Sequence, residues 1–226
     1  MTTIPSEDIV IPYVQKISRD EDGVREWIDT LPYHSQVAIK KLMRYNKDIR
    51  KLTPDENTDR YNGIINNIDE RKRLGLYKPL YDQPRTPGRI ARSEEQSYPR
   101  FFYRAHSANI GWTDWYELPD AIGTTEKGLR MEAFEVCGPN EFDFFASVHV
   151  QNYGWTNWEW PFDIYGTTGN GLQIEAVKVI LEKVKFHIQY RVYIQDYGWT
   201  EWVRDGAPIG SNGQGKAVEA IQMDFY

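Results

Sequence analysis

A five-residue motif recurs three times in the C-terminal half of the chain and restricts the folds open to it. The motif is Gly-Trp-Thr-x-Trp, and its copies begin at Gly111, Gly154 and Gly198, so the steps between them are 43 and 44 residues. A glycine lies eleven residues after the first tryptophan of each copy, and a Glu-Ala pair lies nine residues after that glycine. Three copies with fixed offsets predict a repeat architecture. The later landmarks are Gly123, Gly166 and Gly210, with Glu132-Ala133, Glu175-Ala176 and Glu219-Ala220.

Each copy has the pattern of a β unit. A lead strand precedes a turn rich in Asn, Asp and Gly, residues that tolerate left-handed backbone. The Trp-Thr-x-Trp segment then begins a strand in which two tryptophans three positions apart would face opposite sides. In the closing strand, the central glutamate is expected to satisfy backbone donors of the adjacent glycine loop or, alternatively, to contact a ligand. The lead strands are predicted at 102–106, 146–150 and 191–194, and the closing strands at 129–136, 172–181 and 216–225.

Three such units predict an all-β domain of three pseudo-threefold repeats over residues 100–226. We expect a β-prism, because closure of the three units shortens exposed strand edges, and a β-trefoil is the alternative. The first strand, Phe101–His106, and the last, Lys216–Phe225, are expected to pair and close the ring. The repeats are expected at about 100–142, 143–186 and 187–226.

The first 99 residues have a different character. Residues 1–95 carry a net charge of +1, from 17 Lys+Arg and 16 Asp+Glu, whereas residues 96–226 carry −7, from 10 and 17. Apolar spacings predict helices within residues 24–31 and 34–52. The segment Thr53-Pro54-Asp55-Glu56 predicts the capped start of a further helix that ends near Gly75. We therefore expect the fold class α+β, with a helical adaptor at residues 1–78 and a Pro- and Arg-rich linker at residues 79–99.

The repeat resembles a known family. The succession Gly-Trp-x-x-Trp, Gly-Thr-x-Gly and Leu-x-x-Glu-Ala is similar to the clostridial hydrophobic repeat with a conserved Trp, the ChW repeat. The second copy, Gly166–Ala176, fits best, whereas the first has Glu126-Lys127 in its loop and the third has Ser211-Asn212. The resemblance implies a β-rich surface module of Gram-positive bacteria and their phages that binds carbohydrate or protein and is not an enzyme.

The residues themselves provide no catalytic constellation. None of the four histidines has metal-ligand spacing, and no Gly-x-Ser-x-Gly motif is present. Threefold repetition of the Glu-Ala glutamate argues against a glycosidase pair, which needs two unlike environments. The single cysteine, Cys137, is expected to be a buried structural residue. We therefore expect a non-enzymatic protein without a metal or a cofactor. The histidines are His34, His106, His149 and His187.

Two interpretations of the tryptophans stay open. In the first, exposed Trp and Tyr side chains in the Gly-Trp turns stack on the sugar rings of cell-surface polysaccharide, the polar residue between the two tryptophans forms hydrogen bonds, and three shallow sites give avidity. In the second, every tryptophan belongs to the core and the domain is an assembly surface. The candidate glycan-binding residues are Trp112, Asp114, Trp115, Trp155, Asn157, Trp158, Trp199, Glu201 and Trp202.

The wider context follows from features that are missing. The segment Met1–Asp8 does not have the pattern of a secretory signal, and no apolar run approaches the roughly 20 residues of a membrane span. The net charge of −6 argues against a nucleic-acid partner. We expect a virion or extracellular protein, a phage head or tail fibre or decoration, that is homo-oligomeric and attaches to a capsid or tail protein through residues 1–99. A bacterial ChW-repeat surface or protein-interaction module without sugar binding is the alternative.

Overall fold

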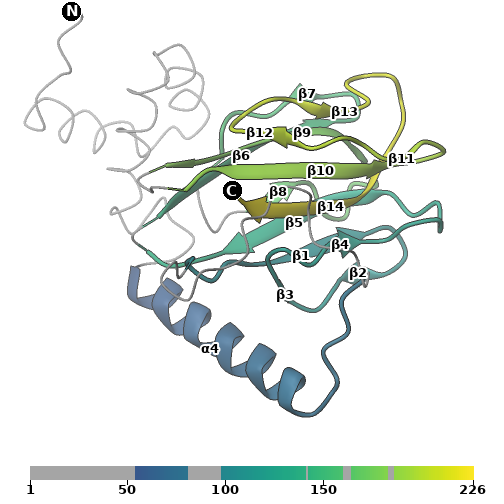
Figure 1. Ribbon diagram of the computed structural model, residues 1–226. Helices are drawn as coiled ribbons and strands as arrows, with labels where there is room; N and C mark the ends of the chain where they lie inside the picture. Colours follow the sequence, from purple (N-terminus) through teal and green to yellow (C-terminus); the bar gives the residue numbers. More distant parts are fainter. Residues whose placement is uncertain (1–53, 81–97, 141, 160–163, 183–185) are drawn as a thin grey trace, which may run out of the picture. The chain divides into compact units, whose positions relative to one another are not determined.

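The computed structural model describes residues 54–80, 98–140, 142–159, 164–182 and 186–226 (Figure 1). The chain divides into two compact units, Met1–Glu56 and Asn57–Tyr226. The helices expected within residues 24–52, the Thr53 cap and residues 81–97 of the expected linker lie outside the described residues. Residues 57–80 belong to the same compact unit as the three repeats, and this unit contains the candidate site.

One helix, α4 (Pro54–Arg73), is described. Pro54 suits the first helical position, and Asp55 lies in the first turn, where the helix dipole favours an acidic side chain. The last turn carries basic side chains, and Gly75, with φ of 69°, lies just beyond it. The helix expected from Thr53 to about Gly75 is therefore confirmed from Pro54 onward.

The rest of the described unit is β structure in three antiparallel sheets, none of which closes into a barrel. Each sheet has one long lead strand paired with one long closing strand, flanked by strands of two or three residues. The first sheet has the order β2 (Gly111–Trp112), β1 (Phe102–Ser107), β5 (Met131–Cys137), β8 (Ile164–Gly166), with β3 (Tyr116–Glu117) on β1. The second has the order β7 (Gly154–Trp155), β6 (Asp143–Val150), β9 (Ile174–Glu182), β13 (Ile209–Gly210). The third has the order β11 (Gly198–Trp199), β10 (Ile188–Ile194), β14 (Val218–Phe225), β4 (Ile122–Gly123), with β12 (Val203–Arg204) on β10.

The repeats are joined because each gives one short strand to the sheet of another. The second repeat's β8 pairs with the first repeat's β5, and the third repeat's β13 pairs with the second repeat's β9. The first repeat's β4 pairs with β14 at the end of the chain, which completes a cycle of three exchanges. The expected pairing of the first and last long strands is therefore wrong. The two edges of β14 are already occupied by β10 and β4, and β1 has β5 on one side and β2 and β3 on the other.

The exchanged strands explain the glycine that recurs eleven residues after the first tryptophan. At Gly166, φ is +110°, and a Cβ would lie 2.4 Å from the carbonyl oxygen of Glu132 in the neighbouring repeat. Gly123 and Gly210 have positive φ as well, and a Cβ on either would lie 2.2 Å from the equivalent glutamate carbonyl. No other residue type permits both the backbone angle and this approach. The expected tight glycine loop is confirmed, and glycine is needed at its start because the backbone of a neighbouring repeat's sheet lies against this position.

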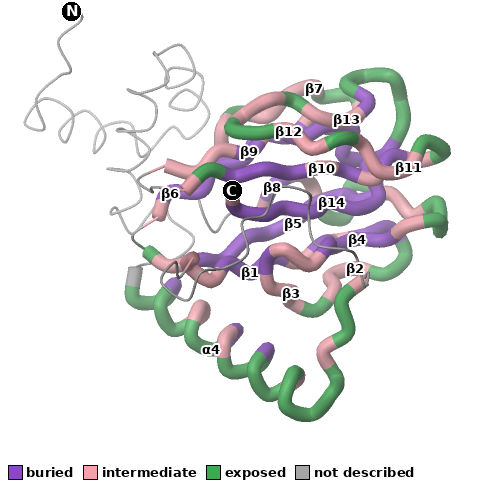
Figure 2. The backbone as a smooth tube through the Cα atoms, in the orientation of Figure 1, coloured by how far each residue is buried: buried purple, intermediate pink, exposed green. Residues whose placement is uncertain are grey.

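Alternation along the lead strands separates a core face from an outer face. Side chains that point inward, such as Tyr103, Phe144 and Tyr190, are fully buried in one large apolar cluster. Figure 2 shows buried residues along the long strands β5, β10 and β14. The intervening residues point outward and meet the tryptophan motif. The coarser expectation, a helix beside an all-β unit of three repeats, is confirmed.

Candidate functional site

Each repeat presents a tight hairpin between its lead strand and its Gly-Trp strand. The first residue of the turn is left-handed in all three, with φ of 65° at Asn109, 68° at Asn152 and 63° at Asp196. The glycine before the tryptophan also has positive φ, so the expected left-handed turn is confirmed. A backbone hydrogen bond across each tip, such as Tyr153 N to Val150 O at 3.0 Å, fixes its shape.

The threonine of the motif attaches the segment to the lead strand at two points. The Thr156 amide donates to Val148 O at 2.8 Å, and its hydroxyl oxygen accepts from Val148 N at 3.1 Å. Thr113 and Thr200 make the same pair of bonds to Ala105 and Val192. The regular strand ends immediately before this threonine. Its threefold recurrence in the sequence was the signal for this role, which sequence reasoning missed.

As a result, the two tryptophans of a repeat do not face opposite sides. The Arg104 guanidinium lies 4.7 Å from the ring centres of both Trp112 and Trp115. Arg191 lies 4.7 Å from Trp199 and 4.9 Å from Trp202. The expectation of opposite faces is wrong, because the strand alternation on which it rests ends after the first tryptophan.

The second repeat also has a cation over its first tryptophan, but this cation comes from the closing strand, β9, and not from the lead strand. Ser147 stands where the first and third repeats have Arg104 and Arg191, and its pairing partner across the sheet is Lys178. The Lys178 ammonium lies 3.9 Å from the ring centre of Trp155. A cation over the first tryptophan is therefore common to all three repeats, and such contacts stabilise partly exposed rings by about 0.5–1 kcal/mol.

All six motif tryptophans are half-buried, and none belongs to the buried core. The ring of the first tryptophan in each repeat is held by a cation above it and by an aromatic edge from the lead strand. His106, His149 and Tyr193 lie opposite the first tryptophan of their repeat, with ring centres 5.3, 5.6 and 5.7 Å away in edge-on orientation. The arrangement fixes the indoles on the outer face of each sheet, so the interpretation that every tryptophan is core is wrong.

The Glu-Ala glutamates are buried at the junctions between repeats. The Glu132 and Glu175 carboxylates lie 3.2 and 3.1 Å from the Nδ1 atoms of His106 and His149. The third repeat has a tyrosine in place of the histidine, and burial raises the pKa of Glu219, with the Asp196 charge adding to the shift. The Glu219 carboxylate accepts a hydrogen bond from the backbone of Gly128 in the first repeat's loop. The glutamate was expected to accept a hydrogen bond from the backbone of a glycine loop, and Glu219 is the one of the three that does so.

The first repeat differs because α4 covers its outer face. Ile64 and Ile68 of the helix pack with Phe102 and Cys137 in a small buried cluster that Trp115 adjoins. The Arg60 guanidinium lies 5.0 Å from the Trp115 ring centre.

The last turn of α4 occupies the polar groups of the same motif. Arg71 donates to Trp115 O at 3.0 Å and pairs with Asp114 at 3.2 Å. Two of the nine candidate binding residues, Asp114 and Trp115, are therefore engaged within the chain.

The most exposed aromatic side chains of the described unit are two tyrosines that the candidate list omits. Tyr153 and Tyr197 stand at the hairpin tips, next to the motif glycine, and are 78% and 79% exposed. The first repeat has Ile110 there, 50% exposed. Among the motif residues themselves, only the polar central ones, Asp114, Asn157 and Glu201, are classed as exposed. The sequence signal for Tyr153 and Tyr197 was an aromatic residue inside a turn, a position from which a side chain does not reach the core.

Within the described parts of the chain, no group of three His, Cys, Asp or Glu side chains is placed to hold a metal ion. Cys137 is buried, as expected, and burial raises the pKa of its thiol to about 12. His187 is exposed, and its Nδ1 atom lies 3.0 Å from a carboxylate oxygen of Asp205.

Comparison with known proteins bears on the repeat directly. The sequence model of the clostridial hydrophobic W family matches three times, at residues 106–136, 149–183 and 193–225. The chain carries three ChW repeats. Each match begins at the residue that contacts the first tryptophan edge-on, and each ends within one residue of the end of the closing strand.

The resemblance inferred from the motif is thereby confirmed. No curated protein and no solved structure matches the chain. No helix among the described residues is long and apolar enough to cross a membrane.

Proposed function

We propose that the three ChW repeats form a non-enzymatic module that binds cell-surface polysaccharide at its hairpin tips. The observation that carries the proposal is the pair of tyrosines, Tyr153 and Tyr197, which leave most of their ring surface in water on backbone that is held rigid. Exposed aromatic rings beside polar side chains are the elements from which sugar-binding surfaces are built. A rigid loop also reduces the ordering cost of binding.

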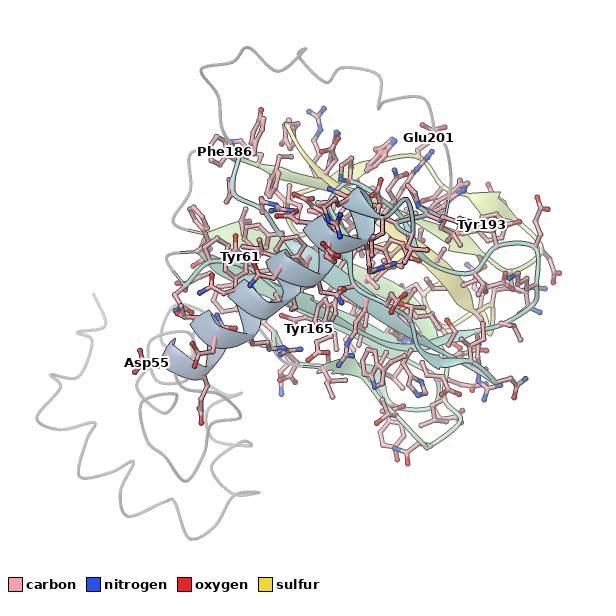
Figure 3. All side chains as sticks on the ribbon, turned by 90° about the horizontal axis from the view of Figure 1, so that it is seen from below. Asp55, Tyr61, Tyr165, Phe186, Tyr193 and Glu201 are labelled. Carbon is pink, nitrogen blue, oxygen red and sulfur yellow. The ribbon has the colours of Figure 1, made fainter. Side chains whose placement is uncertain are left out.

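In this proposal, the tryptophans support the hairpin tips. The first tryptophan of each repeat lies directly after the turn glycine, and a cation and an aromatic edge hold its ring in place. The motif also places an exposed polar residue, Glu201, on the segment that follows the third tip, where its carboxylate can accept hydrogen bonds (Figure 3). For the architecture, we propose the β-prism, because each sheet is built on the two long strands of one repeat and the exchange of short strands runs in one cycle through all three.

A titration tests the proposal. Purified protein is mixed with polysaccharide released from clostridial cell walls, and tryptophan fluorescence is followed because a first tryptophan lies two residues from each tip. A saturable change, with a matching signal on a glycan array, is expected. A flat titration together with an empty array would leave the module without its proposed ligand.

A second candidate is a protein-binding module, and one observation favours it. The outer face of the first sheet already receives an amphipathic helix, α4, through apolar contacts and ion pairs. The same kind of face on another repeat would accept a helix of another protein. Retention of an unrelated protein with no response to polysaccharide would favour this candidate.

The virion role expected from the sequence is part of the proposal. In it, residues 1–99 attach to a capsid or tail protein, the protein is a homo-oligomer, and the β unit meets the host surface. Mass spectrometry of purified phage particles tests this role, since the polypeptide must be present in stoichiometric amount. The bacterial surface module is the alternative, and it predicts the polypeptide in a cell-wall fraction instead.

A further inference from the structure

We infer that only the second and third repeats bind, through Tyr153 and Tyr197, that the first repeat is committed to α4, and that the ligand is an uncharged polysaccharide. The inference rests on the proposed function and specifies its residues, its number of sites and the chemical class of its ligand. Sequence symmetry alone favours three equal sites, so the structural differences between the repeats carry the argument.

The first difference is at the hairpin tip. The three tip residues are equivalent in position, each following a left-handed Asn or Asp and preceding the motif glycine. Two are tyrosines that are almost four-fifths exposed, whereas the first is Ile110, whose aliphatic side chain has no planar face to stack on a sugar ring.

The second difference is what covers the motif behind the tip. In the first repeat, Arg71 of α4 holds both the Asp114 carboxylate and the Trp115 carbonyl, and Arg60 lies against the Trp115 ring. Lys72 pairs with Glu117 at 2.6 Å beside them. A ligand at this repeat would have to displace a helix whose apolar side chains are buried, so the first repeat serves as the attachment surface for α4.

The third repeat shows how its tip is kept in place. Lys216, from the glycine-rich loop, pairs with Asp196 at 2.6 Å, directly before Tyr197. Tyr197 N donates to Ile194 O at 3.0 Å. The ring is thus presented on a tip whose one neighbouring carboxylate is already neutralised.

The charge of the module restricts the ligand. Residues 96–226 hold 10 Lys+Arg and 17 Asp+Glu, a net charge of −7. Among the cations, Arg104, Lys178 and Arg191 lie over tryptophan rings, and Lys216 is paired with an aspartate. A polyphosphate such as a teichoic acid would meet repulsion from this net charge. An uncharged polymer avoids this repulsion.

The test is co-sedimentation of the full-length protein with clostridial cell-wall sacculi that retain their neutral polysaccharide. The variants are Tyr153→Ala, Tyr197→Ala and the double variant, with Ile110→Ala as the matched control at the equivalent tip. Since binding falls from two points to one, each single tyrosine variant is expected to weaken apparent affinity at least ~10-fold, and the double variant to abolish it. Ile110→Ala is expected to bind like the wild type. All four are expected to keep the wild-type unfolding midpoint, because these side chains are exposed.

Competition identifies the ligand class in the same assay. Soluble neutral wall polysaccharide is expected to release the protein, and soluble poly(glycerol phosphate) is expected to leave it bound. Release by the polyphosphate overturns the ligand class. Equal weakening by Ile110→Ala overturns the assignment to two repeats, while polysaccharide binding at the hairpin tips stands. Unchanged binding of the double variant overturns this inference and also the hairpin tips as the binding surface of the proposed function. A wild-type protein that binds neither sacculi nor polymer overturns the proposed function, and this inference with it.

Discussion

The exchange of short strands between repeats makes a sharp prediction about two kinds of glycine. Gly166 lies in β8 against the neighbouring repeat, whereas Gly154 lies at a hairpin tip with φ of +83° and no atom within 4 Å of its Cβ position. Replacement of Gly154 by alanine therefore costs only the left-handed conformation, about 1–2 kcal/mol.

Gly166→Ala carries that conformational cost and two further ones. Its Cβ would lie 2.4 Å from Glu132 O and 3.0 Å from Ala133 Cα, so β8 has to move away from β5. Forcing one methyl group into packed structure costs about 1–3 kcal/mol. The shift also weakens the bond from Thr167 N to Glu132 O, now 2.9 Å, by about 0.5–1.5 kcal/mol. The sum is about 2.5–6.5 kcal/mol, a large part of the total stability of a domain.

Urea unfolding followed by tryptophan fluorescence measures both variants. The free energy of unfolding is expected to fall at least about 1.5 kcal/mol further in Gly166→Ala than in Gly154→Ala, because the methyl overlap and the weakened hydrogen bond apply only to Gly166. If the two variants lie within experimental error of each other, β8 does not pack on the neighbouring repeat, and the cyclic exchange is refuted.

Further predictions concern single contacts. Thr156→Val is expected to destabilise the protein by about 1–3 kcal/mol in urea, because the buried Val148 amide loses an acceptor, while Thr156→Ser is expected to retain most of the stability; equal losses would contradict the two-point attachment. Lys178→Met is expected to cost about 0.5–2 kcal/mol through the lost cation–π contact with Trp155, and an unchanged urea midpoint would argue against that contact. Ile68→Ala is expected to lower the free energy of unfolding by about 2–5 kcal/mol, since Ile68 of α4 is fully buried against the first sheet. A decrease below about 1 kcal/mol would contradict the packing of α4 on that sheet. Because burial raises the pKa of Cys137 to about 12, the folded protein is expected to resist iodoacetamide at pH 8.5 and to react only after unfolding. The unfolded thiol ionises near pH 8.5 and the folded one does not, so this residue's contribution to stability is present below that pH and declines above it by up to about 1.4 kcal/mol per pH unit.

The sequence predicted the long strands because their pattern needs only local information. The alternation around Tyr103 and the offsets between glycine and Glu-Ala place the lead and closing strands within two or three residues of their observed bounds. Helix α4 was predicted for a similar reason, from the signals at Pro54 and Gly75. These features depend on side-chain periodicity and on turn chemistry, which are readable from one segment at a time.

The contacts between segments were not predictable in the same way. The offset from Trp155 to Gly166 is identical in each repeat, so it does not indicate which repeat provides the partner strand. The orientation of the tryptophans was mispredicted because Thr156 ends the regular strand through its own hydrogen bonds. The docking of α4 on the first sheet distinguishes one repeat from the others, and nothing in the repeated motif marks it.

The exchange of a cation between strands is an intermediate case. Arg104 and Glu135 in the first repeat correspond to Ser147 and Lys178 in the second. Both positions are visible in an alignment of the repeats, yet only the pairing of β6 with β9 shows that they are neighbours. Once that register is known, the compensation follows directly from the sequence.

Amide hydrogen exchange, with and without neutral clostridial wall polysaccharide, tests the central claim most directly. We expect saturable protection of the hairpin tips at residues 151–154 and 195–198, and unchanged exchange along β5 and α4. Protection that is confined to α4 and the first sheet, or absent from the whole chain at saturating polymer, would contradict the account.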